Sequence, residues 1–423
     1  MLKDLQSDSF DSFMRMPNKF FMSVGLIPYS LHNEPNQLKY RLMLFLFFCS
    51  FTNLILLVLG ECIYFCKTFG NFKNFVDAVS VTLCIGFIFL ALAKVSAVFW
   101  KRDQMSRLMS DLELMFPKTD GEAREYNVGK FRSQTVFLMK LYATIQMVMI
   151  WCFNFYPLTE TLSGYMNDGS WEVGRFLLCL TANFSRLTYF CFQSDFPYII
   201  WYPFNPYAPG YFELNWMSQM WAAYVSAAGM LATDLLLCGA VEQICMHFEY
   251  LNKQLLSMRP NTRTGDIDYS KLKKIVRTHN EIIRLTVELD DIFGGSILFN
   301  FVSSSVIICV VGFLVTTADR SIEVVKYSFT LISSIIQVYI VCLMGDKFIV
   351  SSTGIADAVY NSYWFDGPIK YKKSLVLIIQ RSFQRPQKLT AYKFSVANMK
   401  NFSNVLSTSY QFFALLHQVY DDK

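Results

Sequence analysis

The last uncharged stretch of the chain, Asn401 to Tyr420, carries polar side chains at helical spacing. Read as a helix, it places one stripe along a single side: Asn404, Thr408, Gln411, Leu415, Gln418 and Asp422. A membrane helix carries such a stripe where it faces protein or water, because lipid cannot hydrogen-bond to amides and hydroxyls. Two interpretations are open. Either the stripe bonds to neighbouring helices, which this stretch by itself favours, or it forms a pore wall that Leu415 and Val419 narrow.

No pattern typical of catalysis or metal binding accompanies this stripe. The four histidines do not stand at a metal-ligand spacing from a cysteine or from one another: His32, His247, His279 and His417. The GxSxG, Walker lysine and GxGxxG motifs are also missing from the sequence. We therefore expect no enzyme, no cofactor and no metal site.

One acid, Asp234, lies well inside an apolar run, where a carboxylate is costly. We expect it to be neutralised by a cation such as Lys94 or Lys140, or to reach the cytoplasmic interface. Lys94 has a second option, because a long lysine side chain can extend its amine to the membrane surface.

The composition is that of a membrane protein. Of the 423 residues, 53% are hydrophobic and only 17% are charged, against about 25% in a soluble domain. Seven apolar runs predict membrane-crossing helices, at residues 42–60, 75–100, 133–159, 214–241, 292–318, 327–345 and 401–420. The predicted fold class is therefore an all-α membrane protein with seven transmembrane helices. The net charge of +5 is too small to indicate nucleic acid as a partner.

The distribution of Lys and Arg predicts the orientation of these helices. With seven spans, 28 of the 38 Lys and Arg residues fall on one side, in segments 1–41, 101–132, 242–290 and 346–399, whereas the other side receives seven. The positive-inside rule then makes the N-terminus cytoplasmic and the C-terminus extracellular. An eighth span at 175–204 would move two cation-rich loops outside, and we reject it.

This topology divides the chain into consecutive parts: a cytoplasmic N-terminal segment (1–41), six transmembrane helices (42–345) with an extracellular loop at 158–213, a cytoplasmic segment (346–400) with a short helix at 369–385, and the seventh helix (401–420). The outer loop holds a glycosylation sequon at Asn183. Cys179 and Cys191 in the same loop are candidates for a disulfide, although buried free thiols are the commoner case.

Four motifs stand out in this sequence. They are Ala356–Phe365 (ADAVYNSYWF), Gln380–Pro386 (QRSFQRP) followed by Leu389-Thr390-Ala391, Phe402–Leu416, and Tyr202-Pro203-Phe204. Their order and spacing resemble those of the insect odorant receptors, odour-gated cation channels with an inverted seven-helix topology. The resemblance is specific and covers the whole chain. G-protein-coupled receptors also have seven helices, but their N-terminus lies outside, and their DRY-like and NPxxY-like motifs are missing from this sequence.

The resemblance implies an odour-tuning subunit in the plasma membrane that assembles with an obligate co-receptor into a hetero-tetramer. The segment 242–290 is short, whereas the family's co-receptor has a much longer loop there. In the family the seventh helix lines the pore, which implies a gate at Leu415 and Val419 and a pore glutamine at Gln418. Gln411 of the same polar stripe is a further candidate for the pore wall. The cytoplasmic segment 346–400 would be the anchor that packs subunits together. The alternative is a metabotropic seven-helix chemoreceptor without a pore of its own.

The resemblance also implies an odour pocket in the outer halves of helices two, three, four and six. The residues expected to point inward there are Ser80, Cys84, Phe87, Met149, Phe153, Tyr156, Trp216, Met220, Tyr224, Tyr327 and Leu331. Aromatic and Met side chains with a few polar groups suit a small neutral volatile that is held mainly by apolar burial. Ordinary helix packing and the interfacial aromatic belt remain alternative roles for each of them.

Overall fold

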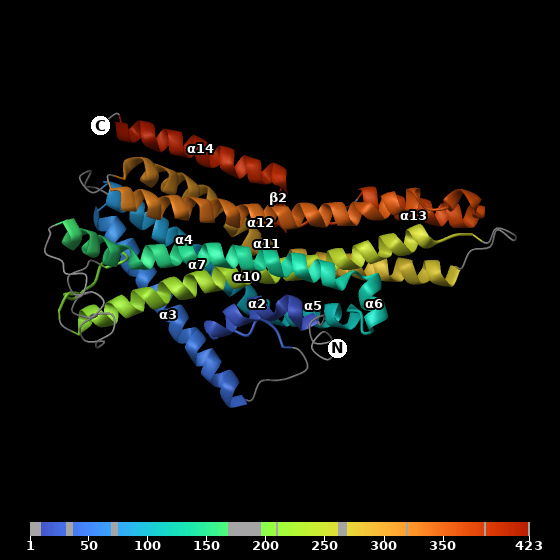
Figure 1. Cartoon of the computed structure of the whole chain (residues 1–423), viewed down its shortest axis with the longest axis horizontal. Coiled ribbons are helices and arrows are strands. Elements are labelled where there is room, and N and C mark those ends of the chain that lie inside the picture. Colours follow the sequence, from blue (N-terminus) through green and yellow to red (C-terminus); the bar gives the residue numbers. More distant parts are fainter. Residues whose placement is uncertain are drawn as a thin grey trace.

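Long, nearly parallel helices form an elongated bundle (Figure 1). The computed structural model describes residues 10–30, 37–68, 75–167, 196–208, 210–260, 269–318, 320–384 and 386–421, without the side chains of 157–167 and 421. The helices are α2 (Phe10–Ser23), α3 (Gln37–Thr68), α4 (Phe75–Trp100), α5 (Arg102–Met115), α6 (Asp120–Glu125), α7 (Val128–Asn167), α10 (Tyr211–Ser257), α11 (Tyr269–Thr317), α12 (Ser321–Tyr360), α13 (Ile369–Gln384) and α14 (Met399–Asp421). The predicted Asn183 sequon, the Cys179–Cys191 pair and Asp422 lie outside the described residues.

Six of these helices are long and apolar enough to cross a membrane: α3, α4, α7, α10, α11 and α12. The seventh long helix is α14, whose many polar residues set it apart from the other six. The predicted class, an all-α membrane bundle, is confirmed. A helix suits this setting because it satisfies its backbone hydrogen bonds internally.

Several helices are longer than a bilayer requires. At about 1.5 Å per residue, the 47 residues of α10 extend roughly 70 Å, more than twice the ~30 Å hydrocarbon core. The 49 residues of α11 extend about as far, and the 40 residues of α12 and the 40 of α7 extend roughly 60 Å. At one end of the bundle α10 and α11 meet α5, α12 meets α13, and α7 meets α6 (Figure 1). The sequence predicts such extensions for α10 and α11 but ends the sixth span at residue 345, whereas α12 continues to Tyr360.

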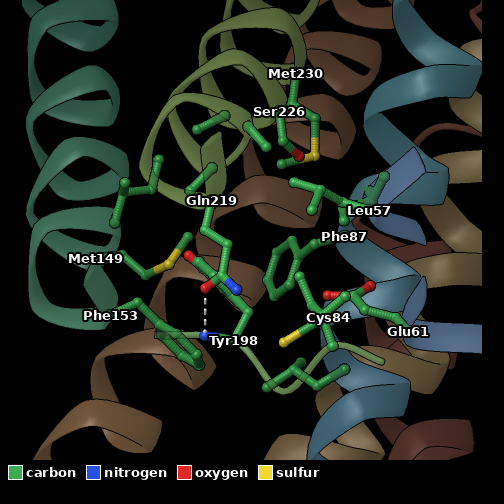
Figure 2. Close-up of a pocket in the computed structure, with 17 residues that line it drawn as sticks. Leu57, Glu61, Cys84, Phe87, Met149, Phe153, Tyr198, Gln219, Ser226 and Met230 are labelled. Carbon is green, nitrogen blue, oxygen red and sulfur yellow. Dashed lines mark hydrogen bonds between the residues drawn. The ribbon is translucent and has the colours of Figure 1, made fainter. Parts of the chain in front are cut away.

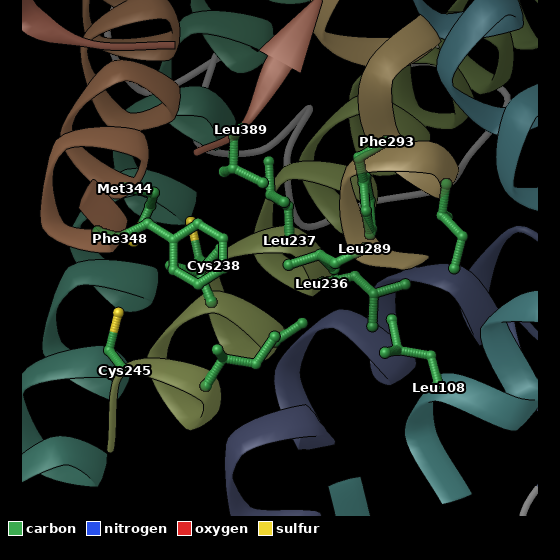
Figure 3. Close-up of a cluster of buried hydrophobic side chains, with 14 of the residues drawn as sticks. Leu108, Leu236, Leu237, Cys238, Cys245, Leu289, Phe293, Met344, Phe348 and Leu389 are labelled. Atoms are coloured by element: carbon green, nitrogen blue, oxygen red, sulfur yellow. The ribbon is translucent and has the colours of Figure 1, made fainter. Parts of the chain in front are cut away.

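The central helix is α10, which is mainly apolar around its circumference and whose residues from Val225 to Phe248 are all buried. Figure 3 shows Leu237 and Cys238 of this helix in one cluster with Phe293 of α11 and Phe348 of α12. All four side chains are buried. Every other long helix therefore takes its position relative to α10 or to a direct neighbour of it.

A small hairpin connects α13 to the last helix. Strands β1 (Thr390–Ala391) and β2 (Ser395–Val396) pair antiparallel, and Tyr392 and Lys393 in the turn have positive φ values of 49° and 65°. The Asp290 carboxylate of α11 accepts hydrogen bonds from the Thr390 backbone N–H (2.5 Å) and hydroxyl (2.9 Å). These bonds fix the start of α14 against the body of the bundle.

Candidate functional site

A narrow cavity of about 70 Å³ lies between α3, α4, α7 and α10 (Figure 2). Its walls are mainly apolar, and its labelled lining in Figure 2 consists of Leu57, Glu61, Cys84, Phe87, Met149, Phe153, Tyr198, Gln219, Ser226 and Met230. We call it the inner cavity. Small residues of α10, Ala222, Ala223 and Ala227, leave the space that larger side chains would fill.

The extended segment 196–204 closes one end of the inner cavity through hydrogen bonds to three helices. The side-chain Oε1 of Gln219 accepts a hydrogen bond from the Tyr198 backbone N–H (3.2 Å), and the Tyr198 hydroxyl donates to Asn154 Oδ1 of α7 (3.0 Å). The Trp201 N–H donates to the Gly60 carbonyl of α3 at 3.3 Å. Gly60 is required here, because a Cβ at this position would lie 2.6 Å from Ile200 Cγ2.

A second, wider space of about 620 Å³ adjoins the inner cavity, and we call it the vestibule. Its lining is more polar and comes from α3, α4, α7, the start of α12 and the segment 196–207. The ammonium of Lys326 lies over three aromatic rings, 3.8 Å from the centroid of Tyr156, 4.4 Å from that of Tyr327 and 5.0 Å from that of Phe153. Such cation–π contacts hold α7 and α12 together at this end.

Four residues line both spaces and form the border between them: Cys84, Phe153, Tyr198 and Ile200. Two of them, Phe153 and Tyr198, are stacked, with ring centroids 6.0 Å apart and planes that differ by 10°. These two rings are the largest side chains at the border.

The structure brings seven of the predicted odorant-site residues to these spaces. Cys84, Phe87, Met149 and Phe153 line the inner cavity, and Ser80, Cys84, Phe153, Tyr156 and Tyr327 line the vestibule. Trp216, Met220, Tyr224 and Leu331 are absent from the described lining of both.

Tyr224 of α10, which was expected to face the pocket, contacts α2 instead. The hydroxyl of Tyr224 donates to Ser23 Oγ of α2 at 2.8 Å, on another side of the helix. The residues that do face the cavity, from Gln219 to Met230, are mostly small. Because α10 is mainly apolar around its circumference, its sequence does not show which face borders a cavity. The size of an aromatic side chain is no guide to that face. Leu331 of α12 packs against an apolar cluster with Phe313 instead.

Sequence reasoning also missed lining residues from two elements. Leu57 and Glu61 belong to α3, and Tyr198 and Ile200 belong to the segment before α10. Glu61 directly follows the predicted span 42–60, yet α3 continues to Thr68. An acid that interrupts a helical apolar pattern was the available signal.

Asp234 is neutralised by Lys94, one of the two cations expected. The Lys94 ammonium lies 2.7 and 2.8 Å from the two carboxylate oxygens. Lys94 is fully buried, so its amine does not extend to the membrane surface, whereas Lys140 is exposed. The Tyr142 hydroxyl also donates to Asp234, at 2.9 Å. Asp234 lies one helical turn from Met230, which lines the inner cavity.

The last helix, α14, lies on one flank of the bundle against α11 and α12 (Figure 1). Val405 and Ser409 are buried on its inner side, and Phe413 packs beside Gly312 of α11. The polar stripe faces the other way: Asn404, Thr408, Gln411 and Gln418 are exposed, as are Leu415 (58%) and Val419 (44%). Within the described ranges, none of these four polar side chains has a hydrogen bond to another helix, which leaves another chain or water as their partner.

Comparisons with known proteins agree on one family. Residues 74–410 match the family model described as 7tm Odorant receptor. Odorant receptor 67c of Drosophila melanogaster is 30% identical, with 99% of both chains aligned, and Odorant receptor 85c of the same species is 31% identical over 96% of this chain and 99% of its own. The olfactory receptor OR5 of Machilis hrabei, solved in complex with eugenol, has a TM-score of 0.77 at 16% identity, covering 97% of this chain and 98% of that one, and thus shares the fold. The chain belongs to the odorant receptor family, whose members are multi-pass membrane chemoreceptors and not enzymes.

Proposed function

We propose that this chain is the odour-tuning subunit of a ligand-gated, non-selective cation channel in the plasma membrane. The observation that carries the channel part is the polar stripe of α14, which is exposed on a helix at the flank of the bundle. A helix of this kind is stable in a membrane when its polar side meets water or matching helices. Copies of α14 from several subunits around one axis would supply both a water-filled space and matching helices.

Within this pore, Gln411 and Gln418 form polar levels of the wall, and Leu415 and Val419 form the hydrophobic constriction. Two exposed apolar residues between polar ones suit a gate that closes by dewetting. The remaining subunits are the co-receptor, in a hetero-tetramer. The anchor segment 346–400, which contains α13, contributes to the cytoplasmic contacts between subunits.

The odorant binds in the inner cavity, where Cys84, Phe87, Met149 and Phe153 provide an apolar wall. Ligand pockets commonly measure some 300–1,000 Å³, so a space of about 70 Å³ must widen on binding. Displacement of Phe153 or Tyr198 toward the vestibule supplies that volume. In this proposal Ser80, Tyr156 and Tyr327 belong to the entry path.

In our proposal the N-terminus is cytoplasmic and the vestibule is extracellular. Support comes from the position of the cation-rich segments: α5, α6 and α13 gather at the end of the bundle opposite to segment 196–207 (Figure 1). The positive-inside rule assigns this end to the cytoplasm. The sequon at Asn183 would then face the glycosylation machinery.

The test is a recording from excised membrane patches of cells that express the chain with a co-receptor. A volatile that evokes current in the absence of nucleotides supports the channel. A response that requires intact cells and G-protein signalling would instead identify the alternative, a metabotropic receptor without its own pore. Fluorescent tags on the two termini, quenched from one side of the membrane, test the orientation.

A further inference from the structure

Glu61 has unusual surroundings for a carboxyl group. It belongs to the membrane helix α3, it is 1% exposed, and it lines the inner cavity. Figure 2 shows its side chain reaching toward Cys84 and Phe87. Its Oε2 atom has no hydrogen-bond partner. In the described ranges, no Lys, Arg or His forms an ion pair with it.

Two other polar side chains of the lining, those of Gln219 and Tyr198, already have partners. Gln219 accepts the Tyr198 N–H and donates to the Tyr202 hydroxyl at 3.1 Å. The Tyr198 hydroxyl donates to Asn154. Glu61 therefore offers hydrogen-bonding capacity that the protein itself does not use, next to an apolar space.

The chemistry of a lone acid in such a place is restrictive. An ionised carboxylate without a cation is very costly in an apolar interior, whereas a neutral carboxylic acid is tolerated and presents one O–H donor. A carbonyl oxygen is a matching acceptor that brings no charge into the membrane. A ligand without an oxygen atom would leave the acid unpaired, and sites built around such a donor reject analogues that lack the acceptor.

We propose that Glu61 determines specificity in the inner cavity, and that its ligand is a small neutral volatile with a carbonyl oxygen, a ketone or an ester. The O–H of Glu61 donates to that oxygen, while Phe87, Met149 and Met230 contact the alkyl chain. This inference rests on the proposed function, because it takes the inner cavity as the odorant site.

The test compares two molecules of nearly the same shape, 2-hexanone and 2-methyl-1-hexene, in which a C=CH₂ group replaces the C=O group. The readout is ligand-induced thermal stabilisation of the chain assembled with its co-receptor in lipid nanodiscs, with the variants Glu61→Met and Glu61→Gln. Glu249→Gln is the matched control, because Glu249 lies at the far end of α10.

We expect the wild type and Glu249→Gln to bind the ketone more tightly than the alkene by a factor on the order of ten. Glu61→Met should remove this preference while the alkene still binds, which also shows that the variant folds. Glu61→Gln should keep part of it, since an amide retains an N–H donor. Equal binding of ketone and alkene by the wild type, an unchanged preference in Glu61→Met, or no stabilisation by the ketone up to its solubility would overturn the proposal.

Two further results are decisive. A preference for 2-aminohexane over 2-hexanone that Glu61→Met abolishes would overturn the proposal, because it would identify an ionised carboxylate that binds ammonium. Stabilisation by the ketone without current in any patch would contradict the channel function and leave the assignment of Glu61 intact.

Discussion

The ammonium group of Lys94 lies 2.7 and 2.8 Å from the two carboxylate oxygens of Asp234, in the interior between α4 and α10. Tyr142 of α7 donates to the same carboxylate at 2.9 Å, and Gln337 of α12 lies at 3.4 Å. Four membrane helices thus meet at one buried polar cluster. Since Asp234 is one turn from the cavity residue Met230, this cluster joins the wall of the proposed odorant site to the centre of the bundle.

Removing only one of the two charges of the Lys94–Asp234 pair should destabilise the protein strongly. Asp234→Asn leaves the Lys94 ammonium buried without a counter-charge, and the expected loss is about 3–5 kcal/mol. The double variant Lys94→Met, Asp234→Asn removes both charges, keeps an oxygen that accepts from Tyr142, and should recover most of the loss. Melting temperatures of the purified variants and their surface expression measure the effect. A single variant that melts with the wild type would disprove the role of the pair.

The position at which α14 begins depends on a close contact between the hairpin and Gly345 of α12. A Cβ at this position would lie 2.0 Å from the backbone carbonyl oxygen of Ala397, so Gly345→Ala must push the hairpin away. We expect a loss of about 1–3 kcal/mol, as for other overpacked sites. Gly129→Ala is the control, since a Cβ there meets nothing within 4 Å. If both variants melt alike, the hairpin does not rest on α12 as described.

The Asp290–Thr390 contact predicts a link between the hairpin and gating. Thr390→Val removes the hydroxyl that donates to Asp290 at 2.9 Å, which should lower stability by about 1.5–3 kcal/mol and raise the current without ligand. Thr390→Ser retains a hydroxyl and should behave nearly as the wild type. Basal current and melting temperature of both variants give the comparison. The prediction fails if Thr390→Val leaves both unchanged.

Helix identity and fold class followed from the sequence because membrane helices must be long, apolar and internally hydrogen-bonded. The polar stripe of α14 was visible for the same reason, since helical spacing alone places Gln411 and Gln418 together. The cavity was harder to predict. Periodicity shows which side of a helix is polar, but α10 has no polar side, so Trp216 and Tyr224 could not be distinguished from Ala223 and Ser226. Tyr198 enters the site through an irregular segment that has no periodicity.

The ring pair between the two spaces predicts a change in size selectivity. Phe153→Ala removes the ring that stacks on Tyr198 and lies under Lys326. The loss of this ring should join the inner cavity to the vestibule. Branched odorants should gain potency relative to small linear ones, by roughly tenfold if about 1.4 kcal/mol of ring displacement is no longer needed. Trp151→Ala, at an exposed position of the same helix, is the control. Equal shifts for all ligand sizes would count against Phe153 as the barrier.

The pore assignment predicts a specific gating defect in α14. Leu415→Ala combined with Val419→Ala shortens both apolar side chains of the proposed constriction, so water should enter the closed pore more easily. The expected result is a higher current without odorant, while the concentration of odorant at half-maximal response moves little, because neither residue lines the inner cavity. Ala414 is exposed on the same turn, and Ala414→Ser serves as a matched control at the neighbouring position. Unchanged basal current and gating in the double variant would exclude Leu415 and Val419 as the gate, and would return the exposed stripe to a role in contacts between subunits.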